Sequence, residues 1–488
     1  MFRQTDSQRS LFEVGNLMTE SKREACHKSW AGPFREKALP ILLKRETDFA
    51  ELFDDKNGRP NKSVALVVGT LLLKEMNDLT DDEAIGALDF DRRWEYAFEV
   101  EPDQAHVCQK TLHNFRVGLM EHDKSRLVFR GLTDELIGAL GVDVSRQRLD
   151  STHMLSNIAL LSRLGVFCET IRVFLNALKK EHPNAYESLP VGILKRHGNE
   201  SHYADARHQE GPRRLGVVAR DLYRLVNQFK GHEDIQKMEE YRLLERLLKE
   251  RCDLVEESQS PDKDDDDSGE GAVPVKLKSA KEVKSDSMQT PHDPQVTYSG
   301  YKGQGYEVQI AETCVKGNPV QLITHMEVTP SSKSDFSATI PVIDALKEAK
   351  ILPEEMVADT NYSGAKNAAK AAERNVNLLA PCPAKGKPEP GTTYPAPTPE
   401  CPKTEKEAGE WMKQQEAQPD FQERYAIRSG IEATNSEIKR VGGLGHLRVR
   451  GGERVKLVVH LKGAACNLKR ALHYWLSSTA GGPSPTIA

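Results

Sequence analysis

The sequence lacks the features that mark membrane, secreted and disulfide-linked proteins. Its apolar runs, such as Val64–Leu73, fall far short of the roughly 20 residues that a membrane span needs. The segment MFRQTDSQRS (1–10) holds no apolar signal core, so we expect no secretion. The eight cysteines are scattered without a CxxC pair, which argues against a disulfide framework and a zinc knuckle. We therefore expect a cytoplasmic protein without a membrane partner.

The composition is that of a soluble protein, but its charge is unevenly distributed. Of 488 residues, 38% are apolar and 29% are charged, which suits two or three domains with packed cores. The net charge is −5, of which residues 253–270 alone carry −8. Residues 421–475 carry +7. A basic region beside a nearly neutral remainder hints at a polyanionic partner. Charge alone, however, favours the simpler reading of a solvated helical surface.

The first part of the chain reads as a helical unit. After a tail over residues 1–32, we predict an all-α domain over residues 33–140. The stretch Lys62–Met76 is strongly apolar, and Thr80 with Glu83 forms a capping box before the next apolar run. Small helical units often bind DNA, so this domain is a candidate DNA-binding unit. No turn signature establishes a helix-turn-helix.

The remainder, residues 141–478, reads as an α/β domain. Short apolar or alternating segments predict the strands of its core near residues 146–151, 306–312, 320–328, 355–359 and 376–380. Gly317-Asn318-Pro319 separates two of them and predicts a hairpin.

Two long segments interrupt this core. Residues 155–255 return to helical patterning and predict a helical insertion. Residues 256–290 are rich in Ser, Asp and Lys with few large apolar side chains, so we expect a disordered acidic linker. We expect a second disordered segment over residues 479–488.

The helix predicted over residues 425–441 presents a polar stripe, formed by Tyr425, Arg428, Glu432 and Lys439. At about 100° per residue, these four fall within a stripe about 60° wide. Three isoleucines lie on the other side, at positions 427, 431 and 438. An acid bracketed by cations suits a metal ligand beside an anionic substrate. From geometry alone, a metal-binding helix and an ordinary amphipathic helix explain this stripe equally well.

Two aspartates each end a short apolar strand. Asp150 and Asp359 are followed by small polar residues, and acids at the carboxyl ends of strands point into a shared crevice. Singly, each is better explained as a helix N-cap. Together with Glu432 they form a set of three carboxylates that could hold two divalent ions about 3.5–4 Å apart. Hard oxygen ligands favour Mg²⁺, or Mn²⁺ as a substitute, and the chemistry would be in-line attack on a phosphodiester.

Three sequence blocks resemble the catalytic blocks of bacterial insertion-sequence DDE transposases: LDST (149–152), ADTNYSG (358–364) and YAIRSGIEATNSEIK (425–439). The last block matches the family signature Tyr-x2-Arg-x3-Glu-x6-Lys at all four positions. GLGHLRVRG (443–451) is also similar to the C-terminal part of these proteins. The resemblance implies an α/β ribonuclease-H-like catalytic core, preceded by the all-α domain and interrupted by the helical insertion.

Residue roles follow from the same resemblance. Asp150, Asp359 and Glu432 would be the catalytic acids that bind two Mg²⁺ ions. The signature residues Tyr425, Arg428 and Lys439 would contact DNA phosphates near the cut. We further expect Arg448 and Arg450 to follow a DNA backbone, because glycines keep their loop open. The wide separation of the two aspartates is explained by the insertion.

The resemblance also implies an activity and partners. The protein would bind terminal inverted repeats and target DNA as a homodimer or larger synaptic complex, associated with the bacterial nucleoid when bound. It would nick by hydrolysis and join the 3′-hydroxyl to target DNA. Two alternatives stay open: a ribonuclease-H-like nuclease without strand transfer, and a catalytically inactive DNA-binding or regulatory derivative.

Three other residues are weaker candidates for the site. His153 lies near Asp150, but a structural histidine is the better interpretation. Asp335 is an alternative carboxylate, for which we prefer a helix cap before Ala338. Trp411 lies between the second and third acids, where some related enzymes stack a flipped base, but a packing or surface role is the better interpretation.

Overall fold

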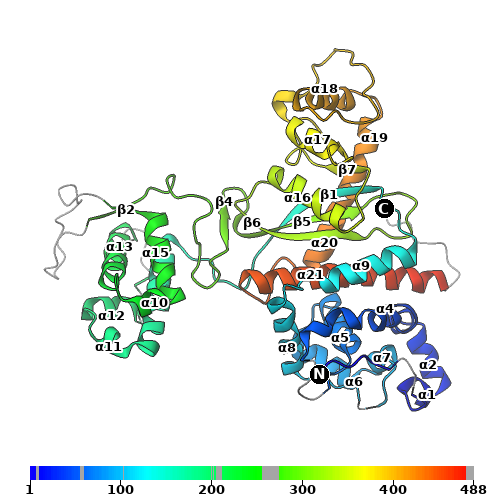
Figure 1. The fold of residues 1–488 in the computed structure, drawn as a ribbon, viewed down its shortest axis with the longest axis horizontal. Helices are drawn as coiled ribbons and strands as arrows, with labels where there is room; N and C mark the ends of the chain where they lie inside the picture. The colour runs from blue at the N-terminus through cyan, green and yellow to red at the C-terminus, as the bar shows by residue number, and fades with distance from the viewer. Residues whose placement is uncertain are drawn as a thin grey trace.

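A mixed sheet forms the centre of the molecule (Figure 1). The computed structural model describes residues 1–6, 10–54, 60–102, 104–198, 201, 203–204, 211–254 and 274–479. The sheet has the order β6-β5-β1-β7-β8, and a short strand, β4, pairs with the near end of β5. β5 is antiparallel to both β1 and β6, whereas β1, β7 and β8 are parallel. The strands are β1 (Arg146–Met154), β4 (Thr297–Ser299), β5 (Gly303–Thr313), β6 (Ile323–Pro330), β7 (Glu355–Ala358) and β8 (Asn377–Leu379).

All five strands predicted for the core exist, with shifted ends. The hairpin predicted around Gly317-Asn318-Pro319 is confirmed, since β5 and β6 pair on either side of it. β1 runs to Met154, past the predicted end at residue 151, because β5 continues to pair with it up to Tyr306. The predicted helical insertion therefore does not begin at residue 155, and its first helix begins at Arg163.

Successive residues of β1 face opposite sides of the sheet. Leu149 packs on one face in a core shared with Val342 and Leu346 of α16 (Asp335–Glu348). Asp150 lies on the other face, opposite Ile310 of β5, under α20 (Gly430–Arg440). α21 (Gly452–Thr479) covers the same face further along.

The N-terminal part of the chain is helical, as predicted. Its helices are α1 (Val14–Leu17), α2 (Glu20–His27), α3 (Ala31–Pro33), α4 (Leu39–Lys44), α5 (Val64–Met76), α6 (Asp81–Phe90), α7 (Arg92–Ala97), α8 (Gln109–Glu121) and α9 (Leu127–Leu140). The capping box of Thr80 and Glu83 is confirmed at the start of α6. The tail expected over residues 1–32 differs, because α1 to α3 lie there and Val14 and Met18 are buried in the core.

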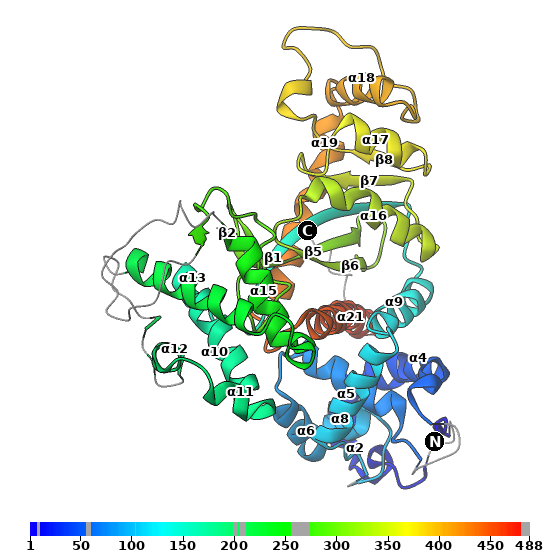
Figure 2. The same cartoon turned by 60° about the vertical axis from the view of Figure 1, so that its left-hand side comes forward.

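α21 lies between the N-terminal helices and the sheet (Figures 1 and 2). One continuous core holds Leu71 of α5, Phe129 of α9, Met326 of β6 and Leu461 of α21. The boundary predicted at residue 140 therefore does not separate two cores. The N-terminal helices and the sheet share one.

The helical insertion has its own core and stands to one side of the sheet (Figure 1). Its elements are α10 (Arg163–Glu181), α11 (Pro183–Glu187), α12 (Val191–His197), α13 (Gly211–Gln228), α14 (Glu233–Gln236), α15 (Glu239–Arg251), β2 (Cys252–Leu254) and β3 (Val275–Leu277). Of the predicted linker over residues 256–290, residues 256–273 lie outside the described residues. The remainder is structured, since β3 pairs with β2 and Met288 is buried in the insertion core.

The remaining helices flank the parallel edge of the sheet. They are α17 (Ala365–Ala372), α18 (Glu405–Glu416) and α19 (Phe421–Ala426). Of the C-terminal segment expected to be disordered, Thr479 ends α21 and residues 480–488 lie outside the described residues. Within the described part of the chain, no helix combines the length and apolar character of a membrane span.

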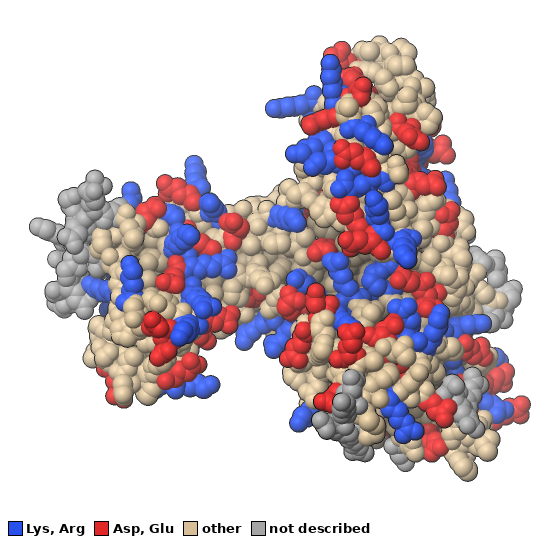
Figure 3. Space-filling view, in the orientation of Figure 1, with Lys and Arg blue, Asp and Glu red and all other residues tan. Residues whose placement is uncertain are grey.

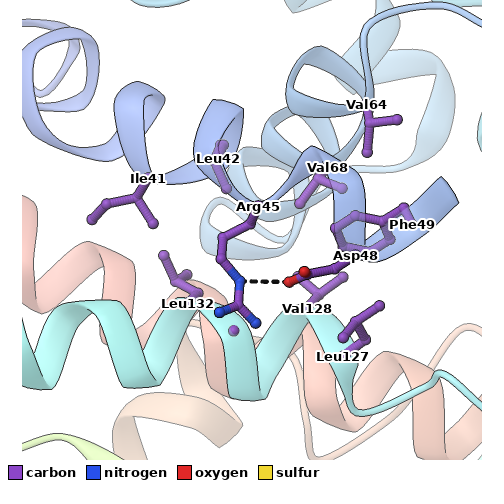
Figure 4. Close-up of a pocket in the computed structure, with 11 residues that line it drawn as sticks. Ile41, Leu42, Arg45, Asp48, Phe49, Val64, Val68, Leu127, Val128 and Leu132 are labelled. Atoms are coloured by element: carbon purple, nitrogen blue, oxygen red, sulfur yellow. Dashed lines mark ion pairs between the residues drawn. The ribbon is translucent and has the colours of Figure 1, made fainter. Parts of the chain in front are cut away.

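A small pocket lies between α4, α5 and α9 (Figure 4). Apolar side chains such as Leu42, Val68 and Leu132 form most of its wall, and Arg45 pairs with Asp48 at 2.6 Å. None of the predicted site residues lines it, so it is separate from the site described next.

Candidate active site

The parallel register of β1 and β7 brings the two predicted aspartates together. Leu149 is level with Ala358, so the following residues, Asp150 and Asp359, lie side by side where β7 ends. The backbone N–H of Asn361 donates to Asp359 Oδ1 at 2.8 Å and fixes that carboxylate in a tight turn. Burial raises the pKa of the Asp150 carboxyl, and the nearby Asp359 carboxylate adds to the shift.

Arg428 bridges all three predicted acids. Its Nη2 lies 3.1 Å from Asp150 Oδ1 and 3.7 Å from Asp359 Oδ2. Its Nη1 donates to Glu432 Oε1 at 2.9 Å. Burial lowers the pKa of the guanidinium, but Asp150 and Asp359 outweigh it and hold this pKa above the usual value. A single cation thus faces three carboxylates.

Glu432 does not join the two aspartates in this structure. Its side chain is 66% exposed and pairs with Arg428. Among the described residues, no three His, Cys, Asp or Glu side chains are grouped closely enough to hold a metal ion. The predicted set of three carboxylates is therefore assembled as two, with the third turned towards solvent.

Asn435 is a site residue that the sequence reasoning missed. Its Nδ2 donates to Asp150 Oδ2 at 3.1 Å, and its Oδ1 is buried without a hydrogen-bond partner. Its position, one turn after Glu432 on the same helix, was the signal that could have revealed it. A free amide oxygen and an excess of carboxylates are the hard donors that Mg²⁺ and Mn²⁺ prefer, so these residues fit a divalent ion.

A buried ionic cluster holds the signature segment against the sheet; we call it the Glu312 cluster, formed by Glu312, Arg148, Arg470 and Thr434. Glu312 is fully buried on β5. It pairs with Arg148 Nη2 and Arg470 Nη1 at 2.5 Å each and accepts from Thr434 Oγ1. Burial opposes ionisation, but Arg470 and Arg148 hold the pKa of Glu312 below its usual value.

The signature segment is not one continuous α-helix as predicted. Arg148 Nη1 donates to the carbonyl of Ile427 at 2.9 Å, within a 3₁₀ turn (Ile427–Ser429) that separates α19 from α20. Gly430 follows directly, and a Cβ there would lie 1.9 Å from Arg148 Nη1. The predicted apolar side is confirmed for Ile431 and Ile438, which are buried in the main core.

The other signature residues occupy different surroundings. Tyr425 is half-buried, and its ring stacks on Phe421 with centroids 5.7 Å apart. Burial raises its pKa. Burial lowers the pKa of Lys439, and the positive charge of Lys302 adds to this effect. The pKa of His153 is lowered mainly by burial, and the positive charges of Lys439 and Lys302 add to this effect.

Lys302 is a second residue that the sequence reasoning missed. Its Nζ lies 2.6 Å from Glu307 Oε1 and 4.0 Å from Asp335 Oδ2. It also donates to Ser151 Oγ, beside Asp150, at 3.3 Å. A lone lysine in a loop gave no signal in the sequence, because only the fold brings it to Ser151 on β1.

Arg448 and Arg450 differ from each other. Arg450 is exposed. Arg448 is bound within the chain, where Nη1 and Nη2 lie 3.0 and 3.1 Å from the Asp78 carboxylate, next to α5. Much of the positive charge predicted over residues 421–475 is paired in this way, Lys462 with Glu75 and Arg470 with Glu312. Figure 3 accordingly shows both signs of charge interspersed on the face it presents.

The weaker candidates are also placed. Asp335 is the first residue of α16, so it is not the predicted cap before Ala338, and it accepts from Gln309 Nε2 at 3.0 Å. Trp411 is 3% exposed and donates to the Thr398 carbonyl, so it packs and cannot stack a base in this structure. His153 Nδ1 lies 3.4 Å from Ser331 Oγ.

Two transposase families match this chain. Residues 283–468 match the Transposase DDE domain, which includes Asp359 and Glu432 but not Asp150. Residues 36–117, in the N-terminal helices, match the Transposase domain (DUF772). No curated protein and no solved structure matches significantly. The fold and the site define an α/β protein with an acidic centre at the ends of two parallel strands. The family matches support a DDE transposase of an insertion sequence.

Proposed function

We propose that this protein is a DNA transposase of a bacterial insertion sequence. It binds the terminal inverted repeats of its element, hydrolyses a phosphodiester at each end and joins the 3′-hydroxyl to target DNA. The working form is a homodimer or larger synaptic complex, associated with the nucleoid while it holds DNA.

The pairing of Asp150 and Asp359 carries this proposal. Two carboxylates stand level on adjacent parallel strands, and the signature segment brings a third within reach of the same guanidinium. The strand order β6-β5-β1-β7-β8, in which β5 alone runs antiparallel to the other four strands, supports a ribonuclease-H-like core. The two family matches point the same way.

Asp150, Asp359 and Glu432 would hold two Mg²⁺ or Mn²⁺ ions. Bound there, the ions would activate the attacking oxygen and neutralise the leaving one. For Glu432 to join the aspartates, its side chain must leave the ion pair with Arg428 and turn inward. Asn435 keeps Asp150 oriented through its hydrogen bond.

The DNA contacts we propose come from the same segment. Arg428, once its carboxylates bind metal, is free to pair with a phosphate near the cut. Lys439, Tyr425 and the exposed Arg450 lie on the same stretch of chain. Arg448 would reach DNA only after leaving Asp78, so we expect the smallest contribution from it.

The test is cleavage of a labelled duplex that carries one inverted-repeat end from the DNA flanking the coding region. Wild type, Glu432→Gln and Asp150→Asn are compared in Mg²⁺, Mn²⁺ and EDTA, with a supercoiled plasmid as target. Glu423→Gln is the matched control, because Glu423 is an exposed glutamate on the adjacent α19. Mn²⁺ binding is measured in parallel by electron paramagnetic resonance.

We expect metal-dependent cutting at the repeat boundary and joining to the plasmid, both lost in Glu432→Gln and Asp150→Asn and kept in Glu423→Gln. Mn²⁺ binding should weaken in Asp150→Asn. Cutting without joining would instead favour the nuclease. DNA binding that none of these substitutions changes, without cutting, would favour the non-catalytic derivative.

A further inference from the structure

The turn between β4 and β5 exposes an aromatic ring, that of Tyr301, next in sequence to Lys302. Tyr301 lies at its tip and is 95% exposed, the highest value for a large apolar side chain among the described residues. An isolated exposed apolar residue needs no explanation by itself. The position of Tyr301 does need one, because the next residue is Lys302, whose side chain reaches Ser151, beside Asp150 on β1.

The turn is fixed in place. Ser299 Oγ accepts from the backbone N–H groups of Tyr301 and Lys302 at 3.4 and 3.2 Å. Gly303 has φ +87°, a left-handed conformation that favours glycine and turns the chain back into β5. Lys302 then ties the turn to Glu307, Asp335 and Ser151. The ring is thus presented on a rigid support.

Two lysines stand near the turn. Lys302 donates to Ser151 Oγ at 3.3 Å and is paired with Glu307 at 2.6 Å. Lys439 of the signature segment is half-buried, and the positive charge of Lys302 lowers its pKa further. A phosphate could pair with either lysine once divalent ions offset the neighbouring carboxylates. A planar ring next to such a cluster is the arrangement with which proteins hold an unpaired nucleotide, the ring stacking on the base and the cations pairing with the backbone.

We propose that Tyr301 stacks on a nucleobase of the element end, next to the scissile phosphate, and that Lys302 pairs with the adjoining phosphate. The inference rests on the proposed function, since it takes DNA as the ligand of the neighbouring acids. Tyrosine suits this role because two side-chain torsions position the whole ring, so little conformational entropy is lost on binding.

The experiment uses the full-length protein and end duplexes in which 5-iodouracil replaces single bases around the cleavage position. Photocrosslinks are mapped by mass spectrometry, and affinity is measured by fluorescence anisotropy in Ca²⁺, without turnover. The variants are Tyr301→Ala and Tyr301→Phe. Val191→Ala is the control for loss of an exposed apolar side chain, because Val191 is 64% exposed at the start of α12, in the helical insertion.

We expect one base position to crosslink to Tyr301, and Tyr301→Ala to weaken binding about 5- to 100-fold. Tyr301→Phe should keep most of the affinity, because stacking needs the ring and not the hydroxyl. An abasic site at the crosslinked position should reduce wild-type affinity to that of Tyr301→Ala and leave Tyr301→Ala unchanged. Val191→Ala should behave as wild type.

Wild-type affinity and no crosslink at residue 301 would overturn the inference. So would a change of oligomeric state in Tyr301→Ala without DNA, measured by sedimentation, because the ring would then contact a second copy. The proposed function has a separate readout in the same samples. If wild type cuts in Mg²⁺ and Glu432→Gln does not, while Tyr301→Ala binds normally, only the stacking inference fails.

Discussion

Two groups of charged side chains meet β1 two residues apart, the acids around Arg428 at Asp150 and the Glu312 cluster at Arg148. The two groups differ in how well their positive and negative charges offset each other. In the Glu312 cluster, Arg148 and Arg470 face Glu312, and Arg470 also pairs with Glu437 at 3.0 Å. The two guanidinium groups there are matched by two carboxylates, of which Glu312 is fully buried and Glu437 is partly exposed. Around Arg428, three carboxylates share one guanidinium, which leaves two negative charges unbalanced.

This difference separates a structural cluster from a site that can take cations. Buried charges are tolerated when partners and hydrogen bonds satisfy them fully. The acids around Arg428 are incompletely satisfied, and the amide oxygen of Asn435 beside them has no partner. Two divalent cations would more than offset the excess. Substitutions should therefore affect activity in one cluster and stability in the other.

The largest expected effect is on catalysis at the unbalanced acids. Asp150→Asn should reduce cleavage about a thousandfold or more, about 4 kcal/mol of transition-state stabilisation. Stability to urea should stay the same or rise, because one of the excess negative charges is removed. Asp420→Asn, at an exposed position before α19, is the control. An Asp150→Asn protein with wild-type cleavage would remove the distinction between the clusters.

The reverse result is expected for the balanced cluster. Glu312→Ala should lower the free energy of unfolding by about 3–5 kcal/mol, because it leaves two guanidinium groups buried without their partner. Urea denaturation followed by circular dichroism measures this. Glu437→Ala, which removes the less buried partner of Arg470, should cost clearly less. Equal losses for both would mean that burial of Glu312 does not decide its contribution.

Gly430→Ala tests whether the position of Arg148 in the Glu312 cluster affects the acids around Arg428. Its Cβ would lie 1.9 Å from Arg148 Nη1, so either the guanidinium or the start of α20 must move. We expect a loss of about 1–3 kcal/mol in stability and a further fall in cleavage beyond what stability explains. Gly445→Ala is the control, since no atom lies within 4 Å of a Cβ built there. Comparable effects of both substitutions would show that the contact with Arg148 is unimportant.

The buried imidazole of His460 is a third site to compare with the two ionic clusters, because it is held neutral. His460 of α21 lies 3.1 Å from the Met326 carbonyl, and burial, then the charge of Arg126, lowers its pKa to about 4. Between pH 6.5 and 4 the unfolded chain binds a proton at this residue and the folded protein does not. The free energy of unfolding is therefore unaffected by this residue above about pH 6.5 and falls as the pH drops towards 4. The loss is about 1–2 kcal/mol by pH 5.

Urea titrations at pH 7 and pH 5 measure this loss. His460→Gln should reduce the difference between the two pH values, whereas His446→Gln, at an exposed position, should leave it unchanged. An unchanged difference in His460→Gln would assign the acid sensitivity to other groups.

The positions of the strands and of the two aspartates were predictable because they depend on local patterns. Short apolar or alternating segments located the strands, and the two aspartates directly follow Leu149 and Ala358, which the structure pairs. The isoleucine side of the signature helix was predictable for the same reason. Helical periodicity needs no knowledge of distant partners.

The rest of the site depends on partners far away in the sequence. Arg148 captures the Ile427 carbonyl and breaks the predicted continuous helix, and Lys302 reaches Ser151 only in the folded sheet. Arg448 and Lys462 are basic in sequence but bound to Asp78 and Glu75 in the structure. Net charge along the chain therefore overstated the basic surface, because it does not record pairing.

The position of α21 also sets the order in which the protein can be completed during synthesis. This helix emerges from the ribosome after every other described element, yet Val455, Leu461 and Leu468 belong to the same core as the helices made first. Until then, the N-terminal helices lack part of their apolar partner surface, which is when a nascent chain is most prone to aggregate. A chain cut before α21 would therefore expose apolar surface on both the N-terminal helices and the sheet.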